Sequence, residues 1–129
     1  MAQLLLDTTV LIDALRGRQA AERLRDLRDE GGPPYVCAIN VEEVWRGARS
    51  DDERAVRQLL GGLRVAPLGR AEGEQAGRWR ARFAAQGTTL SQADCLIAAA
   101  AAGIGARLAT GNPRDFPMEE VEVEHWPVG

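Results

Sequence analysis

The sequence predicts a single α/β domain with a mainly parallel sheet of four to five strands, flanked by helices on both faces. Short apolar segments alternate along the chain with segments of helical spacing, which is the order expected of parallel strands joined by crossover helices. A length of 129 residues with 45% hydrophobic content suits one core. No repeat, low-complexity run or linker divides the chain, so residues 1–129 are assigned to one domain.

The first elements follow from their residue patterns. Residues 3–6 form a continuous apolar strand, and residues 8–15 and 19–30 show helical spacing, the second helix being stopped by two Gly and two Pro. The remaining strands are expected at residues 35–38, 63–67, 107–109 and 121–126, and the remaining helices at 40–49, 51–60, 70–86 and 91–102. Alternation of Val and Glu makes residues 121–126 a half-exposed edge strand.

Composition narrows the functional classes. The formal net charge is −3 and all 16 basic residues are Arg, so a nucleic-acid surface must be a local Arg patch. Without Lys, the chain lacks the basic residue that a phospho-accepting receiver domain needs near its acidic cluster. It also lacks the Gly-x-x-x-x-Gly-Lys loop of P-loop nucleotide enzymes.

The chain has few features of a secreted or membrane protein. Cys37 and Cys95 each lie in an apolar segment and are expected to be buried free thiols, which fits a reducing compartment. The apolar stretches near the N-terminus are split by Asp7 and are too short for a signal peptide or a membrane span. The expected location is the cytoplasm, with no membrane contact.

Four short blocks carry a carboxylate or an amide at or near a strand-to-helix junction. They are LLLDTT (4–9), NVEEVWRG (40–47), LSQAD (90–94) and ATGNPRDF (109–116). A parallel sheet gathers such junctions at one edge, where oxygen ligands from distant segments can hold a hard cation.

These blocks resemble those of the PIN-domain ribonucleases, specifically the VapC-type toxins of bacterial toxin–antitoxin pairs. The resemblance rests on DTTVLID (7–13), EVWRG (43–47), DCLIAA (94–99) and TGNPRDF (110–116), and it covers nearly the whole chain. It implies a PIN-like domain and a Mg²⁺-dependent endoribonuclease that cuts structured RNA such as tRNA or rRNA. Because oxygen ligands accept both ions, Mn²⁺ is a candidate substitute. It also implies a homodimer that is held inactive by a VapB-like antitoxin.

The resemblance assigns roles to particular residues. Asp7, Glu43 and Asp94 match the family's metal-binding and catalytic acids, and the fourth catalytic position, often Asp, falls here on Asn112. Three carboxylates supply about −3 against the +2 of one Mg²⁺, so a second ion would need the substrate phosphate as a ligand. Asp115 matches the Asp of the family's Asp-Phe pair and could contribute through water.

Five further residues are expected near this site. Thr8 and Thr110 resemble the hydroxyl residues that line the family's pocket. Arg16, Arg46 and Arg114 are candidates for contact with RNA phosphates.

Each acid also has a structural alternative. Glu43 stands three residues after Asn40, which is the spacing of a capping box, Asp94 has the same spacing from Ser91, and Asp7 could itself cap a helix. Caps and metal ligands are compatible roles, so the sequence allows both for each acid.

Two further alternatives concern the chemistry. Glu42 is an alternative to Glu43 as the site acid of this helix. Neighbouring positions differ by about 100° around a helix, so only one of the two is expected to face the site, and the spacing to Gly47 selects Glu43. Hydrolysis by a metal-activated water needs no nucleophilic side chain, and His125, the sole His, has no partner for a His-based mechanism. The rival function is a PIN-like RNA- or protein-binding module of weak or no activity, which the Asn at position 112 keeps open.

Overall fold

Five parallel strands form one sheet in the computed structural model, which describes the backbone of residues 3–129 and the side chains of residues 3–27 and 31–129. The strands are β1 (Leu4–Leu6), β2 (Tyr35–Val36), β3 (Arg64–Val65), β4 (Arg107–Thr110) and β5 (Val123–His125). Their order in the sheet is β3-β2-β1-β4-β5. The predicted mainly parallel sheet is confirmed, with β5 at one edge as expected.

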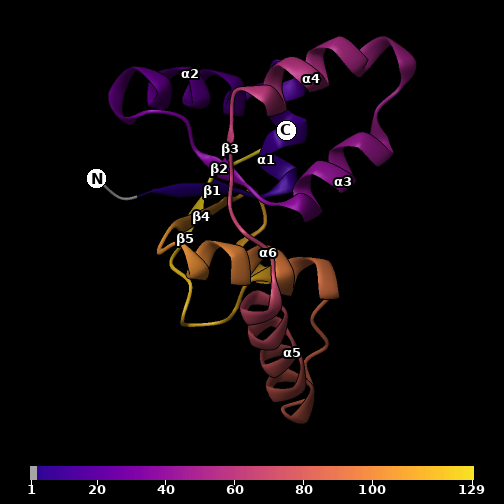
Figure 1. The fold of residues 1–129 in the computed structure, drawn as a ribbon, viewed down its shortest axis with the longest axis vertical. Coiled ribbons are helices and arrows are strands. Elements are labelled where there is room, and N and C mark those ends of the chain that lie inside the picture. The colour runs from indigo at the N-terminus through magenta and orange to yellow at the C-terminus, as the bar shows by residue number, and fades with distance from the viewer. Residues whose placement is uncertain (1–2) are drawn as a thin grey trace.

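Helices cover both faces of this sheet. They are α1 (Thr8–Leu15), α2 (Gln19–Gly31), α3 (Ala38–Gly47), α4 (Glu53–Gly61), α5 (Arg70–Ala85) and α6 (Gln92–Gly103), with short 3-10 helices η1 (Ser50–Asp52) and η2 (Pro113–Asp115). Figure 1 shows α2 and α4 on one side of the strands and α5 and α6 on the other. The predicted two-faced architecture is confirmed.

Strand β1 supplies apolar side chains to both faces. Leu5 packs in the cluster that includes α5 and α6, whereas Leu4 and Leu6 pack in the cluster that includes α1, α2 and α4. Successive side chains of a strand point to opposite faces, so a central strand covered on both sides must be apolar throughout. The uninterrupted Leu4-Leu5-Leu6 run meets this requirement.

The strand order reverses beside β1. From β1 the chain moves outward to β2 and β3, and it then returns to β4 on the other side of β1. The pairing of Leu6 with Ala109 sets the register, and Asp7 N–H continues it by donating to Ala109 O at 2.8 Å. Ligand sites of open α/β sheets lie at such a reversal, beyond the carboxyl ends of the strands. This topology brings Asp7 next to the end of β4.

Several predicted boundaries are wrong by a few residues. Residues 35–38 were expected to form a strand, but β2 ends at Val36 and α3 already begins at Ala38. The reason is that Asn40 Oδ1 accepts the N–H of Cys37 at 2.8 Å, which fixes the first turn of α3 earlier than the apolar pattern indicates. Strands β3 and β5 are shorter than predicted, and Val121 is buried in the core instead of lying in the edge strand.

Both cysteines are buried and free, as predicted. Burial raises the pKa of the Cys37 thiol and of the Cys95 thiol, so both stay protonated and unreactive near neutral pH. None of the helices within residues 3–129 is both long enough and apolar enough to cross a bilayer.

Candidate active site

Asp7 lies at the end of β1 and at the N-cap position of α1, with 5% of its surface exposed. Its side chain makes no capping hydrogen bond. Instead, Asp7 Oδ2 accepts the hydroxyl of Thr110 at 2.7 Å and that of Thr9 at 2.9 Å. The capping alternative is therefore wrong for this side chain. Among the described groups, which are the backbone of residues 3–129 and the side chains of residues 3–27 and 31–129, no donor reaches Asp7 Oδ1, which stays free for a ligand.

The two hydroxyls that hold Asp7 are themselves held by the loop after β4. Thr9 Oγ1 accepts the N–H of Gly111 at 3.0 Å, and Thr110 Oγ1 accepts the N–H of Asn112 at 3.0 Å. A hydroxyl has one hydrogen, so accepting a backbone N–H leaves that hydrogen for the carboxylate. Sequence reasoning expected Thr110 near the site but missed Thr9, whose signal was a hydroxyl residue two positions after Asp7.

Glu43 reaches the site from α3 through a second set of hydrogen bonds. Thr8 Oγ1 donates to Glu43 Oε1 at 2.6 Å, and Asn40 Nδ2 donates to Thr8 Oγ1 at 3.1 Å. Asn40 is fully buried and its other amide atom accepts from Cys37 N–H. The capping box at the start of α3 is therefore formed by Cys37 and Asn40. The alternative in which the Glu43 side chain returns to the N–H of Asn40 is wrong. Asn40 is a second residue whose role in the site was missed.

Glu42 faces away from these residues. It is exposed, and its carboxylate accepts two hydrogen bonds from the Arg46 guanidinium at 2.8 and 2.9 Å. These bonds hold the pKa of Glu42 below its ordinary value. The predicted choice of Glu43 over Glu42 agrees with this geometry. Arg46, expected to contact RNA, is engaged with Glu42 on the outer face of α3.

Asp94 occupies the first turn of α6, where its N–H donates to Oγ of the N-cap residue Ser91 at 3.1 Å. Burial raises the pKa of Asp94 to about 6, and the negative charges of Asp115, Asp7 and Glu43 add to this effect against a lowering hydrogen bond with Ser91. The Ser91 hydroxyl caps α6, but the returning bond of a capping box, from the Ser91 N–H to the Asp94 carboxylate, does not occur among the described residues. The repulsion places Asp94 within electrostatic range of three acids that come from three other segments.

Asn112 and Asp115 are joined in the segment after β4. Asn112 Nδ2 donates to Asp115 Oδ2 at 2.8 Å, and both residues are exposed. The Asn112 amide thus orients the Asp115 carboxylate, whereas an Asp at position 112 would add a further negative charge. Of the expected Arg residues, Arg114 is exposed beside Asp115, whereas Arg16 follows the C-terminal end of α1, roughly 13 Å along the helix from Asp7.

The acidic cluster has no compensating cation from the protein. Among the side chains of residues 3–27 and 31–129, no ion pair involves Asp7, Glu43, Asp94 or Asp115. In the same part of the chain, no three His, Cys, Asp or Glu side chains converge closely enough to hold a metal ion by themselves. The arrangement is an open group of carboxylates at one sheet edge, oriented by hydroxyls and an amide.

The chain is similar to known proteins over most of its length. The PIN domain family model matches residues 4–121. "Ribonuclease VapC10" of Mycobacterium tuberculosis is 33% identical over 117 residues, which cover 91% of this chain and 88% of that protein.

Two solved structures share the fold. One is VapBC2 from Rickettsia felis bound to a DNA fragment from its promoter, with a TM-score of 0.84 and 18% identity, covering 95% of this chain and 98% of that one. The other is DNA-bound VapBC from Salmonella typhimurium, with a TM-score of 0.84 and 22% identity, covering 98% and 99%.

Proposed function

This chain belongs to the PIN-domain family as a VapC-type endoribonuclease, and we propose that it hydrolyses phosphodiester bonds of structured RNA with a divalent cation held by Asp7, Glu43 and Asp94. The observation that supports this most directly is the uncompensated group of acids beyond β1 and β4. A carboxylate that is partly buried near other negative charges, with no cation beside it, is unfavourable in its charged form. Burial, together with these charges, therefore raises the pKa of Asp94 to about 6. Such clusters mark functional sites more often than structural ones.

The donor set suits a hard cation. Mg²⁺ prefers oxygen ligands, keeps several waters and is usually bound by one or two carboxylates together with substrate phosphate. The three acids of this site are too far apart to surround one ion completely. This arrangement suits a Mg²⁺ ion that keeps several waters better than it suits a structural metal, which the protein encloses with its own ligands. Mn²⁺ accepts the same ligands, so either ion would bind directly to Asp7 Oδ1 and Asp94, with Glu43 acting through a water.

The chemistry divides between the ion and the protein. A bound divalent cation would polarise the scissile phosphate and make a water more nucleophilic. The protein orients the acids: Thr9 and Thr110 fix Asp7 through Oδ2, and Thr8 fixes Glu43 through Oε1. The oxygen of Glu43 that Thr8 leaves free can accept a hydrogen bond from the attacking water. No nucleophilic side chain is needed.

The substrate we propose is tRNA or rRNA. Phosphates approaching the acids would meet Arg114, which is exposed in η2 between Asn112 and Asp115. Guanidinium groups suit phosphate because their N–H groups form a planar fork. Arg16 and Arg46 lie outside this immediate approach, so we expect them to contribute less. The free thiols of the core support action in a reducing cytoplasm.

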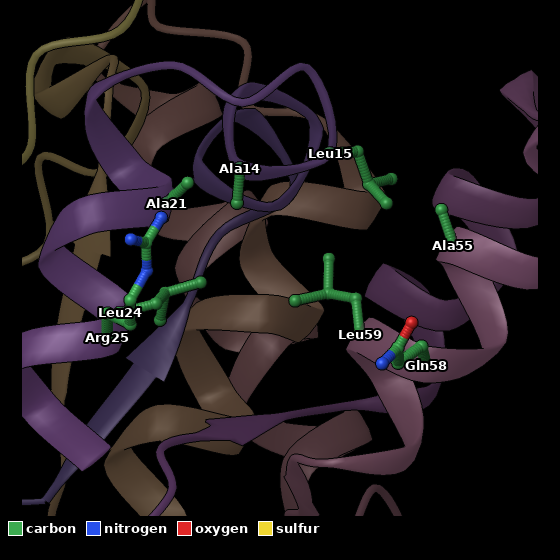
Figure 2. A pocket seen from close by; sticks show the side chains of 8 residues that line it. All are labelled: Ala14, Leu15, Ala21, Leu24, Arg25, Ala55, Gln58 and Leu59. Atoms are coloured by element: carbon green, nitrogen blue, oxygen red, sulfur yellow. The ribbon is translucent and has the colours of Figure 1, made fainter. Parts of the chain in front are cut away.

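We also propose that a VapB-like antitoxin binds this protein in the groove between α1, α2 and α4. The groove has a volume of about 430 Å³, and Figure 2 shows Leu15, Leu24 and Leu59 facing one space from these three helices, with Arg25 at its rim. An apolar groove of this kind takes the apolar face of a helix. The solved VapBC complexes that share this fold support an antitoxin as the occupant.

The test compares Glu43→Gln with Glu42→Gln, two changes that are chemically identical and one position apart. We expect Glu43→Gln and Asp7→Asn to lower Mg²⁺-dependent cleavage of tRNA and rRNA by on the order of 100-fold or more, because each removes charge at the reacting phosphate. Glu42→Gln should cleave normally, because Glu42 pairs with Arg46. Circular dichroism checks that each variant folds.

The outcome separates the two candidate functions. Cleavage that survives in Glu43→Gln and is lost in Glu42→Gln would contradict the proposed site. Wild-type protein that binds these RNAs without cutting them, at any Mg²⁺ or Mn²⁺ concentration, would favour the binding module.

A further inference from the structure

Among the residues whose side chains the structure describes, the buried polar or charged ones are Asp7, Asp13, Asn40 and Thr110. Three of them belong to the site above, whereas Asp13 lies six residues after Asp7 in α1. We propose that Asp13 is a positioning residue for Asp7: it anchors residues 126–129, which hold the loop of residues 110–112 against the active site. The inference rests on the role of Asp7 in the proposed function.

Asp13 joins two segments that are distant in sequence. Its Oδ2 accepts the N–H of Ala20 at 3.0 Å, and its Oδ1 accepts the N–H of Gly129 at 3.0 Å. Only 3% of the residue is exposed, and a buried carboxylate requires such donors. Figure 1 shows the end of the chain beside α1, in agreement with the bond to Gly129. Asp13 thus fixes the end of residues 126–129 to the body of the protein.

Residues 126–129 lie against the loop after β4. Trp126 N–H donates to Thr110 O at 2.8 Å, which extends the pairing of β5 with β4. Val128 then packs on Gly111 so closely that a Cβ added to Gly111 would lie 2.7 and 2.8 Å from the two Val128 methyl carbons. Gly111 does not have a positive φ, so its missing side chain serves this close approach.

The loop in turn orients Asp7. Gly111 N–H donates to Thr9 Oγ1 and Thr9 donates to Asp7 Oδ2, while Asn112 N–H and Thr110 repeat the pattern on the same carboxylate oxygen. If the loop moved away, each hydroxyl would lose its N–H partner and would be free to rotate away from Asp7. The connection from Asp13 therefore runs through Val128 and Gly111 to Thr9 and Asp7.

The first test is Asp13→Asn, which keeps the shape but offers one acceptor atom to two N–H donors. We expect the cleavage rate to fall about tenfold with KM for RNA unchanged, as for other residues that support a ligand from outside the metal site. Asp51→Asn is the matched control, because Asp51 is exposed in η1. If Asp13→Asn does not fold, Val128→Ala replaces it, since it removes the two methyl groups that lie against Gly111 and leaves the bond from Gly129 to Asp13 in place.

Amide hydrogen exchange of the metal-free protein gives a readout that does not depend on cleavage. We expect the Gly111 and Asn112 amides to exchange faster in Asp13→Asn or Val128→Ala, while the core amides of β1 and β4 keep their protection. A merely structural role for Asp13 would instead loosen α1 and α2 and leave residues 111 and 112 protected, and that result would overturn the proposal.

A double variant tests whether Asp13 acts through Thr9. Thr9→Val removes the hydroxyl, and Thr9→Ser should restore activity. Because both changes act on one path, Thr9→Val combined with Asp13→Asn should be little worse than the more severe single change. Losses that multiply, or a normal rate in Asp13→Asn, would overturn the proposal. A wild-type protein that does not cleave RNA would count against the proposed function. Amide hydrogen exchange at Gly111 would still show whether Asp13 holds the loop of residues 110–112 in place.

Discussion

Replacing Asp94 with Asn is expected to stabilise the metal-free protein at neutral pH while abolishing RNA cleavage. Burial raises the pKa of Asp94 to about 6, with further contributions from the charges of Asp115, Asp7 and Glu43. A carboxyl whose pKa is raised on folding is held in its charged form at a cost to the folded state. Asn keeps the shape of the side chain and removes that charge.

The magnitude and the sign follow from the pKa shift. A shift of about 2 pH units corresponds to about 3 kcal/mol, and partial exposure of Asp94 to solvent reduces this to about 1–2 kcal/mol. The folded protein binds this proton more tightly than the unfolded chain does, so the free energy of unfolding falls as the pH rises from about 3.8 to about 6. Above that range the cost is constant, and below it the cost disappears.

Urea unfolding in EDTA measures the effect. Asp94→Asn should raise the free energy of unfolding by about 1–2 kcal/mol at pH 7.5 and change it little near pH 3, since the wild-type carboxyl is then largely protonated in both the folded and the unfolded state. Adding Mg²⁺ should stabilise the wild type more than the variant. Asp51→Asn serves as the control for loss of an exposed charge. An equal or lower stability of Asp94→Asn at pH 7.5 would refute the reasoning.

Two further predictions concern the neighbouring residues and the groove. Asn112→Asp should tighten Mg²⁺ binding to the free protein in calorimetry and lower its stability in EDTA, because the change replaces a hydrogen bond to Asp115 with two adjacent carboxylates. Equal Mg²⁺ binding by both forms would place residue 112 outside the metal ligands and favour Asp115 as the fourth acid. Leu59→Arg should abolish binding of the co-expressed VapB-like antitoxin but not RNA cleavage, whereas Val65→Arg, at an exposed position of β3, should alter neither. Antitoxin binding that survives Leu59→Arg would rule out the groove.

The order of strands and helices could be predicted because the apolar runs and the helical spacing separate clearly along the chain. Boundaries were less predictable where a local hydrogen bond decides them. The start of α3 depends on the bond from Cys37 N–H to Asn40, and Cys is an uncommon N-cap residue, so the pattern pointed to Asn40 instead. Glu42 and Glu43 nevertheless have partners on different sides of α3, Arg46 for Glu42 and Thr8 for Glu43, which agrees with the rotation expected between neighbouring helix positions.

The acids themselves were easier to predict than the residues that orient them. Asp7, Glu43 and Asp94 stand at junctions that any parallel sheet gathers at one edge. The bonds of Thr9 and Thr110 to Asp7 depend on the pairing of β1 with β4, two segments about a hundred positions apart in the sequence. Asp13 was likewise visible only as one more acid in a helix, because its partners come from α2 and from residue 129.

The chemistry of the orienting groups explains why the acids at the sheet edge keep their negative charge, as the proposed cation site requires. Hydroxyls and amides fix a carboxylate without neutralising it, whereas a guanidinium would fix it and also cancel its charge. The chain has 16 Arg, yet the guanidiniums that form ion pairs within residues 3–129 bind other acids, as Arg46 binds Glu42 and Arg82 binds Glu120. The negative charge at the sheet edge is thereby kept, at a cost in stability that a bound divalent ion would offset.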